Sequence, residues 1–298
     1  MNSMDRDQTY QLADGRQLGF IEYGDPDGNA VFFFPGGPST RLFHHPDESI
    51  ALAKNARIIT IDRPGYGLSS FQPGRALLDW PDDVCELAGA LGIDRFAVAG
   101  ISAGGPYVIA CAFKIPERIT SVTIISGVGP TDIEADTKKL YRKRQIAITL
   151  ARKAPWLLRP LIWLLQNPKR RPEGYFERTF AESSPPDQAI LSHPEIKSML
   201  IPNWVEGVRQ GVRGFAWEGV IFAHPWGFPL EEISIPVTLW HGDSDFSIPL
   251  SMAEHMASAI SKSRLRVIPN EGHFLLFKYW KEILSDILET QPGGSLDS

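Results

Sequence analysis

The chain has 298 residues, of which 43% are hydrophobic and 22% charged, and its formal net charge is −5 at pH 7. This composition is ordinary for a globular protein, and the length suits one large α/β domain with an insertion, or two small domains. The acidic balance gives no reason to expect a nucleic-acid partner, and no stretch approaches the ~18 consecutive apolar residues that predict a membrane span.

Cys85 and Cys111 are the two cysteines, and both lie in segments with helical patterns. We therefore expect buried thiols and no disulfide, and no metal-ligand spacing is present. The N-terminal residues 1–10 are polar and charged, unlike a signal peptide. We expect a cytoplasmic protein that needs no cofactor or metal, whose partner is a small-molecule substrate. The sequence leaves the oligomeric state open.

Short apolar strands and helical patterns alternate along the first part of the chain. The predicted elements, in order, are a hairpin over 8–12 and 18–23, strands at 31–34 and 57–61, a helix at 79–91, a strand at 95–99, a helix at 106–113 and a strand at 119–126. The last strand consists mostly of β-branched residues, which is typical of a central position in a sheet. This alternation predicts a mostly parallel sheet with helices on both faces.

The alternation then stops, and no strand is predicted between about residues 131 and 229. Helices are predicted at 136–153, 156–166, 187–192 and 195–222, with prolines between them interpreted as breaks. The strand pattern returns at 237–240 and 265–268, with helices at 250–260 and 279–288. The sequence thus predicts an α/β core formed by residues 1–130 and 230–298, interrupted by a helical cap over residues 131–229.

A G-x-S-x-G motif, Gly100-Ile101-Ser102-Ala103-Gly104, lies between a predicted strand and a predicted helix. In that context the serine sits on a sharp, strained turn that exposes its hydroxyl above the sheet. A Cβ at either glycine would crowd the turn or the neighbouring strand. Ser102 is therefore the candidate nucleophile.

A serine hydroxyl needs a base within hydrogen-bond reach, and His273 follows the last predicted strand. Asp245 follows the strand before it and is the candidate acid, with Asp243 and Asp132 as alternatives. Ser102, Asp245 and His273 all fall at the carboxyl ends of predicted parallel strands, where open α/β sheets place their ligand crevices. For the oxyanion hole we expect the backbone N–H groups of Ala103 and of Gly37.

The candidate triad occurs along the chain in the order Ser102, Asp245, His273. The chain also contains the motifs Phe34-Pro35-Gly36-Gly37-Pro38, Asp62-Arg63-Pro64-Gly65-Tyr66-Gly67 and His241-Gly242-Asp243-Ser244-Asp245. In this the chain resembles the α/β-hydrolase superfamily, in its capped serine hydrolase branch with esterase-like and prolyl aminopeptidase-like members. The resemblance implies an eight-stranded, mostly parallel sheet with a helical cap. The family often has His-Gly where this chain has Pro35-Gly36.

The sequence predicts a serine hydrolase that cleaves a carboxylic ester of a small to medium hydrophobic substrate through an acyl-enzyme intermediate. Aromatic residues in the predicted cap favour an apolar substrate. The alternatives on the same triad are a lactonase, a C–C bond hydrolase and a proline-type aminopeptidase, which needs a cap carboxylate to hold an amino group. The carboxylates available for that purpose are Glu173, Glu177, Glu182, Glu206 and Glu218. A non-catalytic ligand receptor is a further alternative.

Basic residues gather at the start of the predicted cap: Lys138, Lys139, Arg142, Lys143, Arg144, Arg152 and Lys153. They are interpreted as a solvated helix face, in preference to a site for an anionic substrate or a lipid surface.

Overall fold

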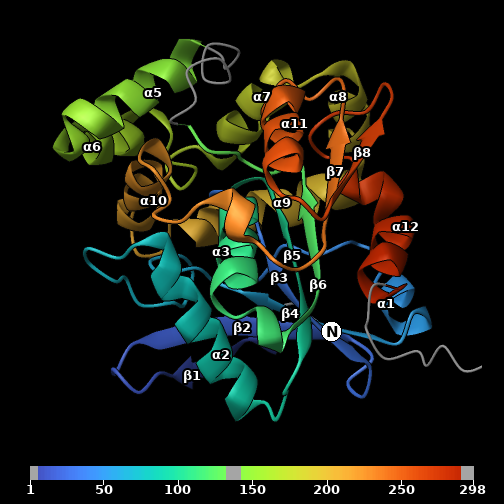
Figure 1. Ribbon diagram of the computed structural model, residues 1–298. Helices are drawn as coiled ribbons and strands as arrows, with labels where there is room; N and C mark the ends of the chain where they lie inside the picture. The colour runs from blue at the N-terminus through green and yellow to red at the C-terminus, as the bar shows by residue number, and fades with distance from the viewer. Residues whose placement is uncertain (1–5, 132–141, 290–298) are drawn as a thin grey trace, which may run out of the picture.

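The computed structural model describes residues 6–131 and 142–289, and at its centre lies an eight-stranded sheet (Figure 1). Its strands are β1 (Gln8–Gln11), β2 (Gln17–Gly24), β3 (Asn29–Phe34), β4 (Ala56–Ile61), β5 (Phe96–Ile101), β6 (Ile119–Ile125), β7 (Val237–Gly242) and β8 (Ser263–Ile268). The spatial order is β1-β2-β4-β3-β5-β6-β7-β8. The β1–β2 and β2–β4 pairs are antiparallel, and all the other pairs are parallel. The predicted α/β fold is confirmed.

The central strands are buried on both faces. Their sequences are therefore continuous apolar runs and do not alternate between apolar and polar residues. In β3, Phe32 and Phe34 belong to the hydrophobic cluster on one face, whereas Val31 and Phe33 belong to the cluster on the other. Successive side chains of a strand point to opposite faces, so one short apolar run supplies both halves of the core.

Helices from different parts of the chain cover the two faces of the sheet (Figure 1). On one face lie α2 (Trp80–Ala90), α3 (Gly105–Lys114) and α11 (Leu250–Ala259). On the other face lie α1 (Ser49–Ala53) and α12 (Leu276–Glu289). The short helix α1 was not expected from the sequence.

The inter-strand segment, defined here as the chain between β6 and β7, contains helices and no strand among its described residues. Its helices are α5 (Arg142–Lys153), α6 (Pro155–Leu165), α7 (Pro172–Glu182), α8 (Pro185–Leu191), α9 (Pro194–Gly207) and α10 (Arg213–Ala223). The start of the helix predicted at 136–153 lies outside the described residues.

Two sequence interpretations of this segment were wrong. The helix predicted at 195–222 is two helices, α9 and α10, because the chain turns at Gly211, which adopts a φ of +91°. Helix α7 was missed because Pro172 was interpreted as a break, whereas it occupies the first turn of that helix. Proline suits the first helical position because the N–H it lacks would be unsatisfied there anyway.

Cys85 and Cys111 are both free thiols; Cys111 is buried as expected, whereas Cys85 is only partly buried, so the prediction of a buried thiol was wrong there. Within residues 6–131 and 142–289, none of the helices has the length and apolarity needed to traverse a bilayer.

Candidate active site

Ser102 stands directly after β5, at the start of a short 3-10 turn that leads into α3. Its φ is +55°, in the left-handed region that non-glycine residues rarely adopt. A Cβ on Gly104 would lie 1.9 Å from the carbonyl oxygen of Phe34, and one on Gly100 would lie 2.8 Å from a methyl group of Val108. The turn is therefore as tight as the motif predicts, and both flanking glycines are required by close approach.

The ends of the parallel strands lie at the same level of the sheet. Ile101 of β5 pairs with Ile125 of β6, and Ile125 pairs with Trp240 of β7. At the end of β7, Gly242 pairs with Ile268 of β8. The loops that carry Ser102, Asp245 and His273 consequently leave the sheet from one edge, the carboxyl edge of its parallel strands.

Asp245 and His273 are in direct contact. Oδ2 of Asp245 lies 2.8 Å from Nδ1 of His273, and their side chains are 0% and 8% exposed. The other carboxylate oxygen, Oδ1, accepts hydrogen bonds from the backbone N–H groups of Ser247 and Ile248, at 2.7 and 2.9 Å. Burial acts to raise the pKa of Asp245, but the facing His273 and His241 side chains and the backbone donors outweigh it and hold the pKa below its ordinary value. An ionised carboxylate only accepts, so Nδ1 of His273 carries the proton and Nε2 is left as the basic nitrogen.

His241, at the end of β7, contacts the loop that carries Asp245. Its Nε2 lies 2.9 Å from the carbonyl oxygen of Ile248 and 3.6 Å from Oδ2 of Asp245. Burial lowers the pKa of His241, with Asp245 acting in the opposite direction. The alternative acid Asp243 is exposed and accepts a hydrogen bond from the backbone of Asn270. The second alternative, Asp132, lies outside the described residues.

The loop after β3 faces the turn that carries Ser102. A Cβ on Gly36 would lie 3.0 Å from the Cβ of Ser102, and one on Gly37 would lie 3.7 Å from the Cβ of Ala103. Gly37 itself is exposed. The two predicted oxyanion donors are therefore neighbours. Within the described part of the chain, the His273 ring forms its hydrogen bond with Asp245 and none with the Ser102 hydroxyl.

A buried ion pair joins α10 to Arg63, which follows β4 and contacts the loop after β3, and the sequence did not predict this pair. Glu218 of α10 is 2% exposed and faces Arg63, whose Nε lies 2.7 Å from Oε1. Arg63 also donates to the carbonyl oxygens of Pro35 and Gly36. Tyr66 donates to Oε2 of Glu218 at 2.7 Å.

Tyr107 extends this network into α3. Its hydroxyl donates to Oε1 of Glu218 at 3.0 Å and accepts from Nη1 of Arg75 at 2.6 Å. Asp62 and Arg63 are adjacent in the chain but bind different partners: Asp62 accepts from Arg41, and Arg63 binds Glu218.

Asp187 of α8 holds the loop that carries His273. Its Oδ2 accepts the backbone N–H of His273 at 2.9 Å, and its Oδ1 accepts that of Phe274 at 2.7 Å. Ser184 donates to Oδ2 at 2.7 Å. A Cβ on Gly272 would lie 2.3 Å from the same oxygen, so α8 can approach only because residue 272 is glycine. The sequence carries no local signal for Asp187.

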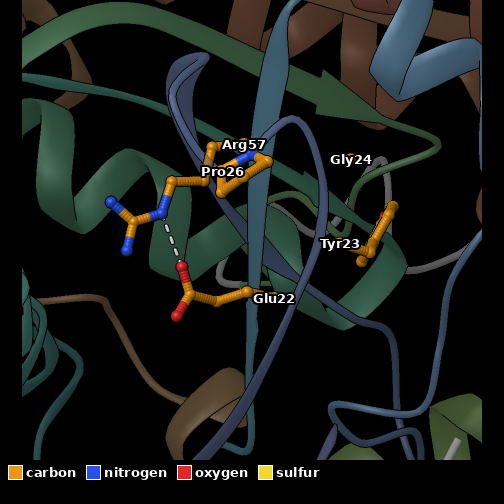
Figure 2. A pocket seen from close by; sticks show the side chains of 5 residues that line it. All are labelled: Glu22, Tyr23, Gly24, Pro26 and Arg57. Carbon is orange, nitrogen blue, oxygen red and sulfur yellow. Dashed lines mark hydrogen bonds and ion pairs between the residues drawn. The ribbon is translucent and has the colours of Figure 1, made fainter.

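A hollow elsewhere on the surface is lined by Glu22, Tyr23, Gly24, Pro26 and Arg57 (Figure 2). Within it, Nε of Arg57 donates to Oε2 of Glu22 at 2.5 Å, as the dashed line in Figure 2 shows. Arg57 pairs with Ala30 near the start of β3, so this hollow lies at the amino edge of the parallel strands. It is therefore at the opposite edge of the sheet from Ser102.

Within residues 6–131 and 142–289, no group of three or more His, Cys, Asp and Glu side chains is arranged to hold a metal ion.

Known proteins that match most of this chain include hydrolases. A family model described as alpha/beta hydrolase fold matches residues 29–278. An uncharacterized hydrolase of Bacillus subtilis, YcgS, is 26% identical over 269 residues, covering 86% of this chain and 89% of its own length. A bifunctional esterase/perhydrolase of Acinetobacter calcoaceticus is 22% identical over 283 residues, covering 92% of this chain and 96% of its own length.

Solved structures show the same fold. A hydrolase from Pseudomonas aeruginosa matches with a TM-score of 0.71 at 18% identity, over 95% of this chain and 97% of that one. A bromoperoxidase from Bacillus anthracis matches with a TM-score of 0.71 at 20% identity, over 95% of this chain and 99% of that one. The family match spans most of the sequence, and the chain therefore belongs to the alpha/beta-hydrolase fold family and is an enzyme of the hydrolase type.

Proposed function

We propose that this protein cleaves carboxylic esters through an acyl-enzyme intermediate on Ser102, with His273 as general base and acid and Asp245 as its orienting carboxylate. The observation that carries the proposal is the 2.8 Å hydrogen bond between buried Asp245 and His273. It lies at the sheet edge where Ser102 occupies its strained turn. A nucleophile, a base and an orienting group gathered in this way are the parts that serine acyl transfer requires.

The reaction follows from these positions. Oγ of Ser102 attacks the ester carbonyl carbon while its proton passes to Nε2 of His273. The oxyanion accepts hydrogen bonds from the backbone N–H groups of Gly37 and Ala103. Nε2 then protonates the leaving alkoxide, and a water molecule activated by the same nitrogen releases the acid. The contact between Ser102 and His273 tightens when substrate binds, as is common for catalytic hydrogen bonds that are loose in the unliganded enzyme.

We further propose that residues 131–229 act as a cap over a core of residues 1–130 and 230–298. The inter-strand segment places Asp187 against the His273 loop and Glu218 against the Gly37 loop. It also places Phe215 beside Gly37, where a Cβ would lie 3.3 Å from the ring. The Phe215 ring beside a predicted oxyanion donor favours an apolar acyl group.

The surroundings of Glu218 favour an ester over a peptide with a free amino group. Glu218 is one of the carboxylates considered for holding an ammonium group, and it lies beside Gly37. A Cβ on Gly37 would lie 3.3 Å from Oε2 of Glu218. Its oxygens already accept from Arg63, Tyr66 and Tyr107. A substrate ammonium would have to displace a buried guanidinium, which is unfavourable. The Acinetobacter relative named an esterase/perhydrolase agrees with this choice.

The test is a panel of p-nitrophenyl esters from acetyl to dodecanoyl, a lactone series and prolyl p-nitroanilide. Ser102→Ala is compared with Ser126→Ala, which removes a hydroxyl from another positive-φ serine, at the end of the neighbouring strand β6. We expect ester turnover that Ser102→Ala abolishes and Ser126→Ala retains. Selective release from the prolyl amide would instead favour an aminopeptidase. Ligand binding without turnover would favour a receptor.

A further inference from the structure

Exposed apolar side chains gather on the α5–α6 hairpin, which consists of helices α5 and α6. In the described part of the chain, nine large hydrophobic residues are exposed, and six of them lie here. Trp156 is 73% exposed and Trp163 is 53% exposed. The other four are Ile146, Leu161, Leu164 and Leu165. Figure 1 shows the hairpin, in green at the upper left, as an outer part of the molecule away from the sheet.

The two faces of α6 are both apolar, but only one has protein to pack against. Leu158 and Ile162 belong to a small cluster with Ala216 of α10. On the opposite side, Trp156 and Trp163 are seven residues apart, about two helical turns, so they form one outward stripe. A helix that is hydrophobic all round is normally covered on every side. The outward face of α6 therefore needs a cover that this chain does not provide among its described residues.

The charged residues of the hairpin and of the segment directly after it are all positive. Residues 142–171 contain nine Lys or Arg and no Asp or Glu, in a chain whose net charge is −5. Exposed examples are Lys153, Arg159 and Lys169. The guanidinium of Arg170 lies 4.8 Å from the centre of the Trp163 ring, so cations border the apolar stripe directly. The interpretation of the basic residues as a merely solvated face does not account for the apolar stripe beside them.

We propose that the α5–α6 hairpin docks on an anionic lipid surface. Tryptophan side chains favour the boundary between head groups and acyl chains, and lysine and arginine attract anionic head groups. A second copy of this chain is a poorer occupant, because twofold pairing through this face brings together the cations that border it in each copy, such as Arg170. The proposal does not depend on the reaction that the protein catalyses.

Flotation of the full-length protein with lipid vesicles tests the proposal. The vesicles are phosphatidylcholine alone, or about three parts phosphatidylcholine to one part phosphatidylglycerol. The hairpin variants are Trp156→Ser with Trp163→Ser, and Lys153→Glu with Arg159→Glu. Leu52→Ser and Arg264→Glu are the matched controls, because Leu52 and Arg264 are exposed and lie outside the hairpin. Circular dichroism shows whether each variant is folded.

We expect the wild type to bind the anionic vesicles about tenfold or more tightly than the neutral ones, and to be released by salt. Each hairpin variant should bind the anionic vesicles about tenfold or more weakly, and the controls should bind as the wild type does. The proposal is overturned if the wild type binds neither vesicle, or if the hairpin variants bind as well as the wild type. It is also overturned if light scattering shows a dimer that the Trp156→Ser, Trp163→Ser variant converts to a monomer.

Discussion

Both carboxylate oxygens of Asp245 have hydrogen-bond partners: Oδ2 pairs with His273, and Oδ1 accepts from the backbone N–H groups of Ser247 and Ile248. These donors stabilise the charged form and explain why its pKa is lowered although burial alone would raise it. Asp245, which orients the base, is thus held ionised mainly by His273 itself, with His241 and the backbone N–H of Ile248 adding to the effect.

The first prediction concerns Asp245→Asn, which keeps the shape but removes the charge. Because the folded-state pKa lies below the ordinary value of 3.8, the charge stabilises the fold above that pH, and the stabilisation is lost as pH falls through the folded-state pKa. We expect Asp245→Asn to be about 1–3 kcal/mol less stable than the wild type at neutral pH. The deficit should shrink below about pH 4. Urea unfolding across pH measures this, and a deficit that stays constant down to pH 3 would contradict it.

Some site residues carry local signals and others do not. Ser102 and the two glycines that flank it are recognisable because a tight turn needs them at fixed spacing, and His273 and Asp245 follow predicted strands. The roles of Asp187 and Glu218 depend on partners 86 and 155 residues away in the chain. Nothing in their own surroundings in the sequence indicates those partners, so their roles required the structure.

At the scale of elements, the inter-strand segment shows where pattern reasoning fails. Helices α6, α7, α8 and α9 all have proline in their first turn. Proline between apolar stretches was interpreted as the end of a helix, but here it marks a beginning. The strands were easier to predict, because burial on both faces gives each a short apolar run with clear ends.

Helix α8 gives the second prediction, through Asp187→Asn. The amide can accept only one of the two backbone N–H groups that the carboxylate accepts from His273 and Phe274. We expect kcat for an ester to fall about tenfold or more with KM little changed, because the base is displaced while the substrate pocket is kept. Steady-state kinetics across pH measures both quantities.

Asp83→Asn is the matched control, because Asp83 is also a buried carboxylate, but it binds Arg16 on the β1–β2 hairpin. This control should lose stability and keep kcat. Equal kcat losses in the two variants would refute a positioning role for Asp187.

At the scale of the molecule, the inter-strand segment and the sheet are joined by buried polar contacts as well as by apolar packing. Glu218 reaches Arg63, and Asn203 of α9 accepts from the backbone and hydroxyl of Thr40. The alternation of strands and helices was enough to predict an α/β sheet. How the segment docks on the sheet could not be predicted, because it depends on these long-range pairs.

The third prediction tests that docking with Glu218→Gln, which leaves the buried Arg63 guanidinium without its counter-charge. Breaking a buried pair by removing one partner costs about 3–5 kcal/mol. Glu206→Gln is the control: Glu206 is 17% exposed, and its partner Arg41 keeps Asp62 and Asp7. We expect the control to lose about 1 kcal/mol or less. Urea unfolding compares them, and equal losses would show that the Arg63–Glu218 pair does not hold the two parts together.

The most direct test of the proposed reaction is to identify the acyl-enzyme itself. The protein is mixed with p-nitrophenyl acetate, quenched in acid during turnover, digested and analysed by mass spectrometry, with Ser102→Ala treated in parallel. The proposed reaction predicts one acetyl group on the peptide that contains Ser102, and none in the variant. An acetyl group on another residue, or undiminished hydrolysis by Ser102→Ala, would contradict it.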